Sequence, residues 1–425
     1  MIRRIESRSP VRQGMRAWFG RPPRRHGEIN EHREVSFVEL FYDLVYVVLI
    51  GQVSHALAGH PSWSAALDFV VLFGLIWIAW FNGSGYHELH GREHGRARSY
   101  LFAQMLLLAV AAAFAQHAVG ADGRVFAVVY ALLLALLWWQ WLEVRLIDTP
   151  EYRPLTTPYL VGIGGGVVAM AASAALTPAA RFLVWCLIVV VMLCGGFWLL
   201  AGGGDRSRPT TVAVTRSLVE RFGLIIIIVL GEVVVGVVRG IAESSRSATT
   251  LATGVLSLGI GFGLWWNYFD LLGRKKPRSA RGALAVWMFG HVPAAMAITA
   301  SGAGLVGLIG AAEGHVTPLA PATLLSVSVA VVLLGVTVLH ATLGPNETPL
   351  STRHVGLSMT VGAVASLCLL AVRPRPWLYA LGLAAILSAT WSYLYVQFWR
   401  NGAGHPAPNP GTAEESADAL IRRNQ

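Results

Sequence analysis

Long apolar segments alternate with short polar linkers along almost the whole chain. Twelve such segments can be separated, near residues 37–58, 62–82, 99–119, 124–146, 155–175, 181–201, 214–238, 249–272, 282–304, 319–343, 354–372 and 376–399. A transmembrane helix needs about 20 predominantly apolar residues, and these segments are close to that length. The pattern therefore predicts an all-α fold, a polytopic bundle of transmembrane helices.

The first six segments resemble the last six. SFVELF at residues 36–41 matches SLVERF at 217–222, and both stretches open an apolar segment with an acid in the same place. FGLIW at 73–77 similarly matches FGLWW at 262–266. Six spans per half give both halves the same orientation, so we expect a parallel repeat of the kind found in transporters. The predicted units are repeats at 37–201 and 214–399, a basic tail at 1–36 and a flexible tail at 402–425.

Composition agrees with this fold class. Hydrophobic residues make up 55% of the chain and charged residues only 13%, whereas soluble domains carry about 25% charged residues. The net charge of +10 could suit nucleic acid, but the basic residues lie in tails and short loops. We therefore expect the lipid bilayer and a small solute or ion as partners, and no nucleic acid. The 3 cysteines lie within predicted spans, so we expect no disulfide, no thiol-bound metal and no cofactor.

Basic residues also predict the orientation. Nine arginines, from Arg3 to Arg33, precede the first span. If this tail is cytoplasmic, the inside loops hold 14 basic residues and the outside loops hold 6. The positive-inside rule then predicts that both termini are cytoplasmic. Because roughly 36 polar residues precede the first apolar run, no secretory signal peptide is recognised.

Ionisable residues within apolar segments are the main functional candidates, because they are costly in lipid and usually face a cavity or a partner. The first span carries Glu39, Asp43, Gln52 and His55. Glu39 and Asp43 share one helix face, whereas Gln52 and His55 share another. We interpret Asp43 as part of a substrate or ion path. The alternative for Asp43 is an internal ion pair with a basic residue such as Arg221.

Glu39 and Glu220 have a structural alternative. Each stands at the end of an S-x-x-E sequence, which is the pattern of a capping box at a helix N-terminus. In such a box the serine caps the helix, and the acid accepts a hydrogen bond from the backbone of that serine. We therefore interpret Glu39, Glu220 and Arg221 as gating or helix-capping groups.

Glu232 is the most isolated acid in the second half, with apolar runs at residues 225–230 and 233–235 on either side. It lies about 16 residues, or 24 Å, beyond Arg216, which predicts a place in the outer half of the membrane. There it must be protonated or paired across helices. Both states suit proton or cation binding. With one gap, Gln52 occupies the matching position in the first half.

Two later spans carry further polar residues. Asn267 and Asp270 share a face, although Asp270 could instead pair with Arg274 at the membrane interface. His291 lies near mid-membrane, and Pro293 just after it predicts a kink that frees backbone carbonyls. His291 therefore suits a proton relay, with a simple interhelical hydrogen bond as the alternative.

Motifs of enzymes are weak in this chain. His90–His94 reads H-x-x-E-H, an inverted zinc-protease motif, but that motif needs a regular helix and Gly91 argues against one. We expect a solvated cytoplasmic loop there rather than a metal site. The sequence contains no P-loop, dinucleotide fingerprint or nucleophile elbow in a suitable setting. We therefore do not expect an enzyme or an ATP-driven transporter.

Several of these stretches together resemble the bacterial low temperature requirement A family. They are ELFYDLV at 39–45 with Gln52 and His55, ERFGL at 220–224 with LGE at 230–232, Trp266 with YFD at 268–270, and GHVP at 290–293. Family members often have Ser after the Gly-Glu pair, where this chain has Val233. The resemblance implies a multi-pass protein of the bacterial inner membrane. It does not imply a molecular activity.

Three functions are compatible with these features. The first is a secondary transporter, coupled to protons through Asp43, Glu232 and His291 between the two halves. The second is an ion channel, because FYD at 41–43 faintly resembles the first-helix motif of two-repeat potassium channels. The third is a non-transporting membrane factor for growth in the cold, in which the buried acids are structural.

Overall fold

The computed structural model describes residues 18, 20, 22–28, 33, 35–92, 94–202, 214–344 and 346–402. Within these residues the chain forms 12 helices that are long and apolar enough to cross a membrane, as the sequence predicts. The first six are α2 (Phe37–Gly59), α3 (Trp63–His90), α4 (Gly95–Ala115), α5 (Gly123–Ile147), α6 (Arg153–Ser173) and α7 (Pro178–Leu200). The other six are α8 (Arg216–Glu243), α9 (Ala248–Leu272), α10 (Arg281–Gly310), α11 (Leu319–His340), α12 (Thr352–Val372) and α13 (Pro376–Gly402).

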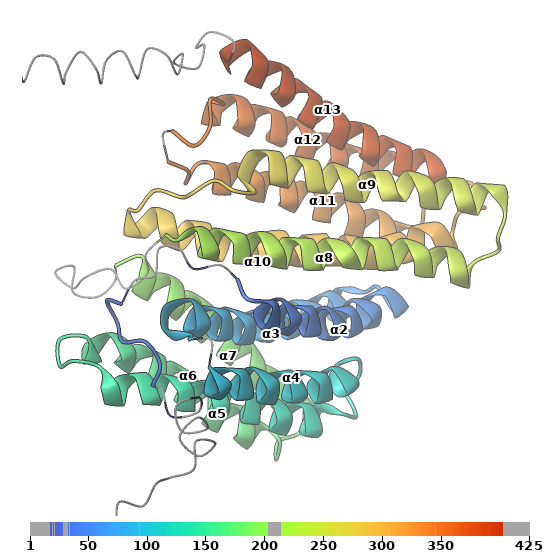
Figure 1. Cartoon of the computed structure of the whole chain (residues 1–425). Helices are drawn as coiled ribbons and strands as arrows, with labels where there is room; N and C mark the ends of the chain where they lie inside the picture. The colour runs from blue at the N-terminus through green and yellow to red at the C-terminus, as the bar shows by residue number, and fades with distance from the viewer. Residues whose placement is uncertain are drawn as a thin grey trace, which may run out of the picture.

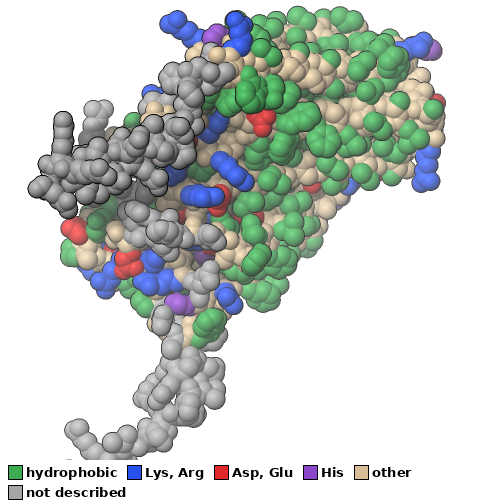
Figure 2. Space-filling model, turned by 45° about the horizontal axis from the view of Figure 1, so that its top comes forward, with side chains coloured by type: hydrophobic (Ala, Val, Ile, Leu, Met, Phe, Trp, Pro, Cys, Tyr) green, Lys and Arg blue, Asp and Glu red, His purple; other side chains and the backbone are tan. Residues whose placement is uncertain are grey.

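The helices lie side by side along roughly one direction, with α13 at one edge of the bundle and α5 near the other (Figure 1). Successive helices run in opposite directions, so α2 begins and α13 ends at the same end. We call this the basic end, because Arg96, Arg98, Lys275 and Lys276 lie there, and the opposite one the far end. Hydrophobic side chains cover much of the flank between the ends (Figure 2). Backbone groups in lipid must be satisfied within the chain, which these continuous helices achieve.

The two groups of six helices share most of their pattern of neighbours. In the first, α2 packs on α3 and α4, α3 packs on α5 and α7, and α4 to α7 pack in succession. In the second, α8 packs on α9 and α10, α9 packs on α11 and α13, and α10 to α13 pack in succession. The groups meet where α2 and α3 contact α8 and α10, and where α7 contacts α10. This interface lies in the middle of the bundle (Figure 1).

Aromatic side chains fill the central part of the interface between the halves. Phe222 on α8 lies between Trp80 on α3 and Trp287 on α10, with ring centroids 5.4 and 4.7 Å away. All three side chains are at most 2% exposed. Dense aromatic packing of this kind contributes both apolar burial and ring contacts.

The main difference from the expected spans is at the end of α3. The sequence predicts a span that stops near residue 82, but the helix continues to His90. It ends where the backbone N–H of Gly91 donates to the carbonyl of His87, 3.0 Å away. The expectation of a solvated loop around the H-x-x-E-H sequence is therefore wrong for the residues up to His90, since His87, Glu88 and His90 are all buried.

Candidate functional site

Four charged side chains meet at the basic end of the interface between the halves. We call Arg33, Glu39, Glu88 and Arg221 the charge cluster. Arg221 Nη2 lies 2.7 Å from Glu39 Oε1, and Arg221 Nε lies 3.5 Å from Glu88 Oε2. The Arg33 guanidinium forms ion pairs with both carboxylates. Two cations thus balance two anions, as burial of charge in a low dielectric requires.

Helix α8 supplies two hydroxyl groups to the same cluster. Ser217 Oγ donates to Glu88 at 2.6 Å, and Thr215 Oγ1 donates to the other oxygen of that carboxylate at 2.7 Å. Thr215 is also the N-cap of α8, because its side chain accepts from the backbone N–H of Leu218. The predicted capping box of Ser217 and Glu220 is therefore wrong. Glu220 instead pairs with Arg216 at 3.0 Å on the helix surface.

The capping role of Glu39 is confirmed. Its Oε2 accepts a hydrogen bond from the backbone N–H of Ser36 at 3.0 Å, while its Oε1 pairs with Arg33 and Arg221. One carboxylate therefore caps α2 and also links α2 to α8.

The segment at residues 22–28 lies against the basic end of the first half. Arg24 Nη2 donates to the carbonyl of Glu88 at 2.7 Å, and Arg24 N donates to the carbonyl of His90 at 3.0 Å. His26 Nδ1 lies 2.7 Å from Asp148 Oδ2 after α5, and both side chains are buried. Burial, and then the positive charge of Arg33, lower the pKa of the Arg24 guanidinium. Sequence reasoning missed this docking, because a basic tail has no apolar periodicity to reveal it.

Asp43 lies one helical turn deeper than Glu39 and is 2% exposed. Its Oδ1 accepts a hydrogen bond from Trp80 Nε1 at 3.0 Å, whereas its Oδ2 has no partner among the described residues. The alternative pair with Arg221 is not formed, because that guanidinium binds Glu39 and Glu88.

Glu232 on α8 faces α2 in the part of the bundle toward the far end. The side chain is 5% exposed, and a Cβ added at Gly51 would lie 3.0 Å from its Oε1. The backbone of Glu232 is fixed from the other side by α10, because a Cβ at Gly302 would lie 2.6 Å from its carbonyl oxygen. In the described part of the chain, no hydrogen bond or ion pair reaches the Glu232 carboxyl group. Glycines on two helices thus make room for a buried acid.

Polar groups continue from Glu232 toward the far end. His55 Nδ1 on α2 contacts the guanidinium of Arg239 on α8, and Arg239 Nε lies 3.7 Å from Glu243. Since Arg239 has no lone pair to offer, the His55 nitrogen must be the acceptor and therefore unprotonated. Gln52 lies on α2 between His55 and Gly51, the residue that Glu232 faces, and it is half-buried.

His291 is completely buried among rings and is hydrogen-bonded at both nitrogens. Its Nδ1 lies 2.6 Å from the carbonyl of Trp287, and its Nε2 lies 2.8 Å from the hydroxyl of Tyr268 on α9. A carbonyl can only accept, so Nδ1 carries a proton. The predicted interhelical hydrogen bond is confirmed. No hydrogen bond among the described residues joins His291 to Asp43 or Glu232, and the rings of Trp80 and Phe222 lie between His291 and Asp43.

Asn267 and Asp270 lie away from this interface, where α9 packs on α13. Asn267 Nδ2 donates to the carbonyl of Leu387 at 3.0 Å and to that of Gly263. Asp270 Oδ2 accepts from Trp391 Nε1 at 2.6 Å. Asp270 therefore binds an indole instead of forming the alternative pair with Arg274. Both side chains hold two helices of the second half together.

The H-x-x-E-H sequence is divided between two helices. His90 is the last residue of α3, and His94 is the N-cap of α4. Glu93 lies outside the described residues, as does the predicted flexible tail after residue 402. Among the residues that the structure describes, no three His, Cys, Asp or Glu side chains are placed to hold a metal ion. Glu88, which precedes this motif, belongs to the charge cluster, and no pattern in the sequence indicated this.

Comparison with known proteins assigns the family. The profile of the bacterial low temperature requirement A proteins matches residues 34–396, so the chain belongs to this family. An uncharacterized protein of Rhizobium meliloti is 25% identical over 57% of this chain, and the match spans 60% of that protein's length. No solved structure matches the chain.

Proposed function

We propose that this member of the bacterial low temperature requirement A family is a secondary transporter coupled to protons. Its path is the interface of α2 with α8, and Glu232 is the group that carries the proton. Asp43 would contribute a second carboxyl group to the path. On this proposal the protein catalyses no covalent chemistry and needs no cofactor.

The position of Glu232 is the observation that carries this proposal. It is a buried acid without a hydrogen-bond partner in the described chain, and it lies between two helices from different halves. Gly51 is twelve residues beyond Glu39 on α2, which places Glu232 about 18 Å from the charge cluster. Acids that deep in a membrane are costly and usually serve transport or proton relay.

The charge cluster would act as the gate at the basic end. Arg221 lies within ion-pair distance of Glu39, but none of its three guanidinium nitrogens is aligned for a hydrogen bond within the described residues. The contact between Arg221 and Glu39 can therefore separate without losing a directed hydrogen bond, whereas opening of the whole cluster also breaks the hydrogen bonds of Ser217 and Thr215 to Glu88. Rocking of one half against the other would then open the path at one end and close it at the other. The matching packing of α2–α7 and α8–α13 supports the internal duplication that this motion needs.

The proposal also includes an orientation in the membrane, which rests on the distribution of basic residues. The basic end would face the cytoplasm, with both termini there, in the bacterial inner membrane. The concentration of basic residues in the loops at that end supports this placement.

A channel is less well supported by the geometry. Conduction needs a continuous hydrated route, but the aromatic rings of Trp80 and Phe222 pack against each other between Asp43 and His291. A non-transporting role would instead require that Glu232 contribute only to stability. Measurement of proton flux separates this role from transport.

The test uses liposomes that contain the purified protein and an internal pH dye, with a potassium diffusion potential as driving force. We expect proton movement in the wild type and its loss in Glu232→Gln. Glu220→Gln is the matched control, because it makes the same change on the exposed face of the same helix. Equal flux in wild type and Glu232→Gln would refute the role of Glu232. No flux with any added ion or solute would favour a non-transporting protein.

A further inference from the structure

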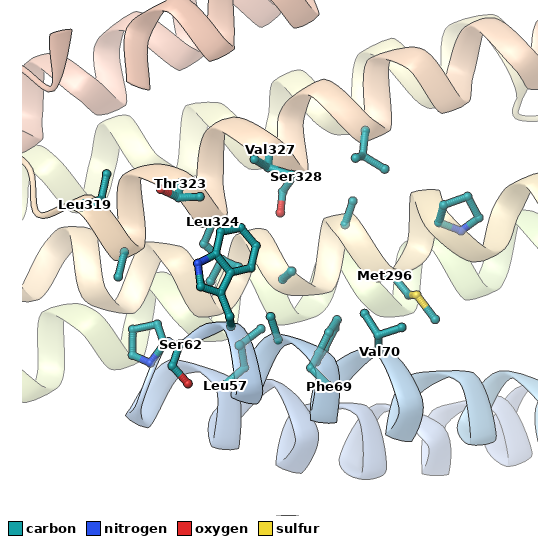
Figure 3. Close-up of a pocket in the computed structure, with 18 residues that line it drawn as sticks. Leu57, Ser62, Phe69, Val70, Met296, Leu319, Thr323, Leu324, Val327 and Ser328 are labelled. Carbon is teal, nitrogen blue, oxygen red and sulfur yellow. The ribbon is translucent and has the colours of Figure 1, made fainter. Parts of the chain in front are cut away.

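A groove of about 530 Å³ separates the two halves near the far end. One wall is formed by the end of α2 and the start of α3, and the other by α10 and α11 (Figure 3). The lining side chains are almost all apolar, as Leu57, Phe69, Met296 and Leu324 illustrate. Its volume lies within the range of about 300–1,000 Å³ that is usual for small-molecule sites.

The mouth of the groove opens on the membrane-facing surface. Four large apolar side chains of the lining are also exposed, and they belong to membrane-spanning helices: Trp63 (85% exposed), Val70 (44%), Leu319 (60%) and Val327 (42%). The groove is therefore continuous with the surface that hydrocarbon covers. Water would be a poor occupant, because an apolar cavity offers few hydrogen-bond partners.

We propose that this groove binds an acyl chain of a bilayer phospholipid. The chain enters laterally between α3 and α11 and lies against Phe69, Met296 and Leu324. Its glycerol end is placed beside Ser62 and Trp63, at the turn between α2 and α3, because indole rings prefer the membrane interface. The leaflet is the one at the far end.

Such a lipid would affect how the two halves are arranged relative to each other. The groove walls come from different halves, so an acyl chain fills space that would otherwise close or collapse when one half rocks against the other. It therefore favours the arrangement in which the groove is open. This binding site does not depend on whether the protein transports protons.

The experiment uses nanodiscs of phosphatidylethanolamine and phosphatidylglycerol with a phospholipid whose acyl chain carries a diazirine. Val327→Trp places an indole at the mouth of the groove. Val338→Trp is the matched control, because Val338 lies three turns along the same face of α11, is 48% exposed and is not in the lining. Both substitutions face lipid, so both proteins should fold.

After irradiation, peptides that cover residues 61–70 and 319–331 are compared with α12 peptides from the lipid-facing surface. We expect enrichment of the groove adducts in wild type and in Val338→Trp. In Val327→Trp we expect the yield of groove adducts to fall at least about fivefold, as a modest loss of lipid affinity would produce. Equal adduct yields in all three proteins would overturn the proposal. Labelling by a diazirine fatty acid but not by the phospholipid would overturn the assigned occupant.

Discussion

Arg221 on α8 and Glu39 on α2 form an ion pair of 2.7 Å across the interface between the halves, with side chains only 1% and 6% exposed. A buried guanidinium of this kind is tolerated only because carboxylates surround it. The pair therefore ties the start of α2 to the first turns of α8 and orders the basic end of the interface.

Removal of Arg221 should destabilise the protein strongly. Arg221→Met leaves Arg33 as the remaining ion-pair partner of Glu39 and Glu88 among the described residues, and loss of one partner of a buried pair costs about 3–5 kcal/mol. Because Arg33 compensates in part, we expect about 3 kcal/mol in the free energy of unfolding, measured by SDS titration in mixed micelles.

Arg216→Met is the matched control for this change. Arg216 lies on the same helix, but its side chain is 77% exposed and its one ion pair within the described residues is with Glu220. Exposed pairs contribute about 0–1 kcal/mol, so a small loss is expected. Equal losses for Arg216→Met and Arg221→Met would contradict the importance of the buried cluster.

A larger residue at Gly51 should disturb Glu232 without touching its chemistry. A Cβ there already lies 3.0 Å from Glu232 Oε1, so Gly51→Val forces the carboxyl group to move or the helices to part. We expect lower proton flux in liposomes, together with about 1–3 kcal/mol of lost stability from overpacking. Gly59→Val on the same helix is the control, because a Cβ at Gly59 meets no atom within 4 Å. Unchanged flux in Gly51→Val would argue against a path at this contact.

The helices and many of their ends could be predicted from the sequence, because bilayer thickness limits the length of each apolar run. The end of α3 could not. Tyr86, His87, Glu88 and His90 look like a polar loop when read alone, and they stay helical because partners distant in sequence bury them. The candidate site shows the same division. Glu232 was recognisable as an isolated acid, whereas the pairing of Glu88 with α8 depends on tertiary contacts.

The polar path could be predicted only in part, for a related reason. A single sequence shows which helix carries an ionisable group but not which neighbour its face meets. Glu232 does face the opposite half through Gly51. Asn267 and Asp270 face α13 instead, and nothing in their own helix distinguishes these two outcomes.

We predict that His291 contributes to stability and not to proton movement. Tyr268→Phe removes the hydroxyl beside Nε2 and leaves a buried nitrogen without its partner. That loss costs about 1–3 kcal/mol of stability. Because aromatic rings separate His291 from Asp43, we expect proton flux to persist. Flux abolished in correctly folded Tyr268→Phe protein would return His291 to the proton path.

The docked segment at residues 22–28 should detach when Asp148 is replaced. Asp148 accepts from His26 twice, at 3.1 Å from the backbone N–H and at 2.7 Å from Nδ1. Asp148→Ala removes both contacts, so the bond after Arg25 should open more often to trypsin. We expect faster cleavage there by mass spectrometry, by about fivefold for each kcal/mol of lost docking energy. Glu151→Ala, an exposed acid in the same turn, should cleave like wild type. The same variant also tests whether this segment stabilises the charge cluster, because Arg24 contacts the Glu88 carbonyl beside it. The quantity to measure for this test is the free energy of unfolding. Rapid cleavage without any change in unfolding free energy would show that it does not.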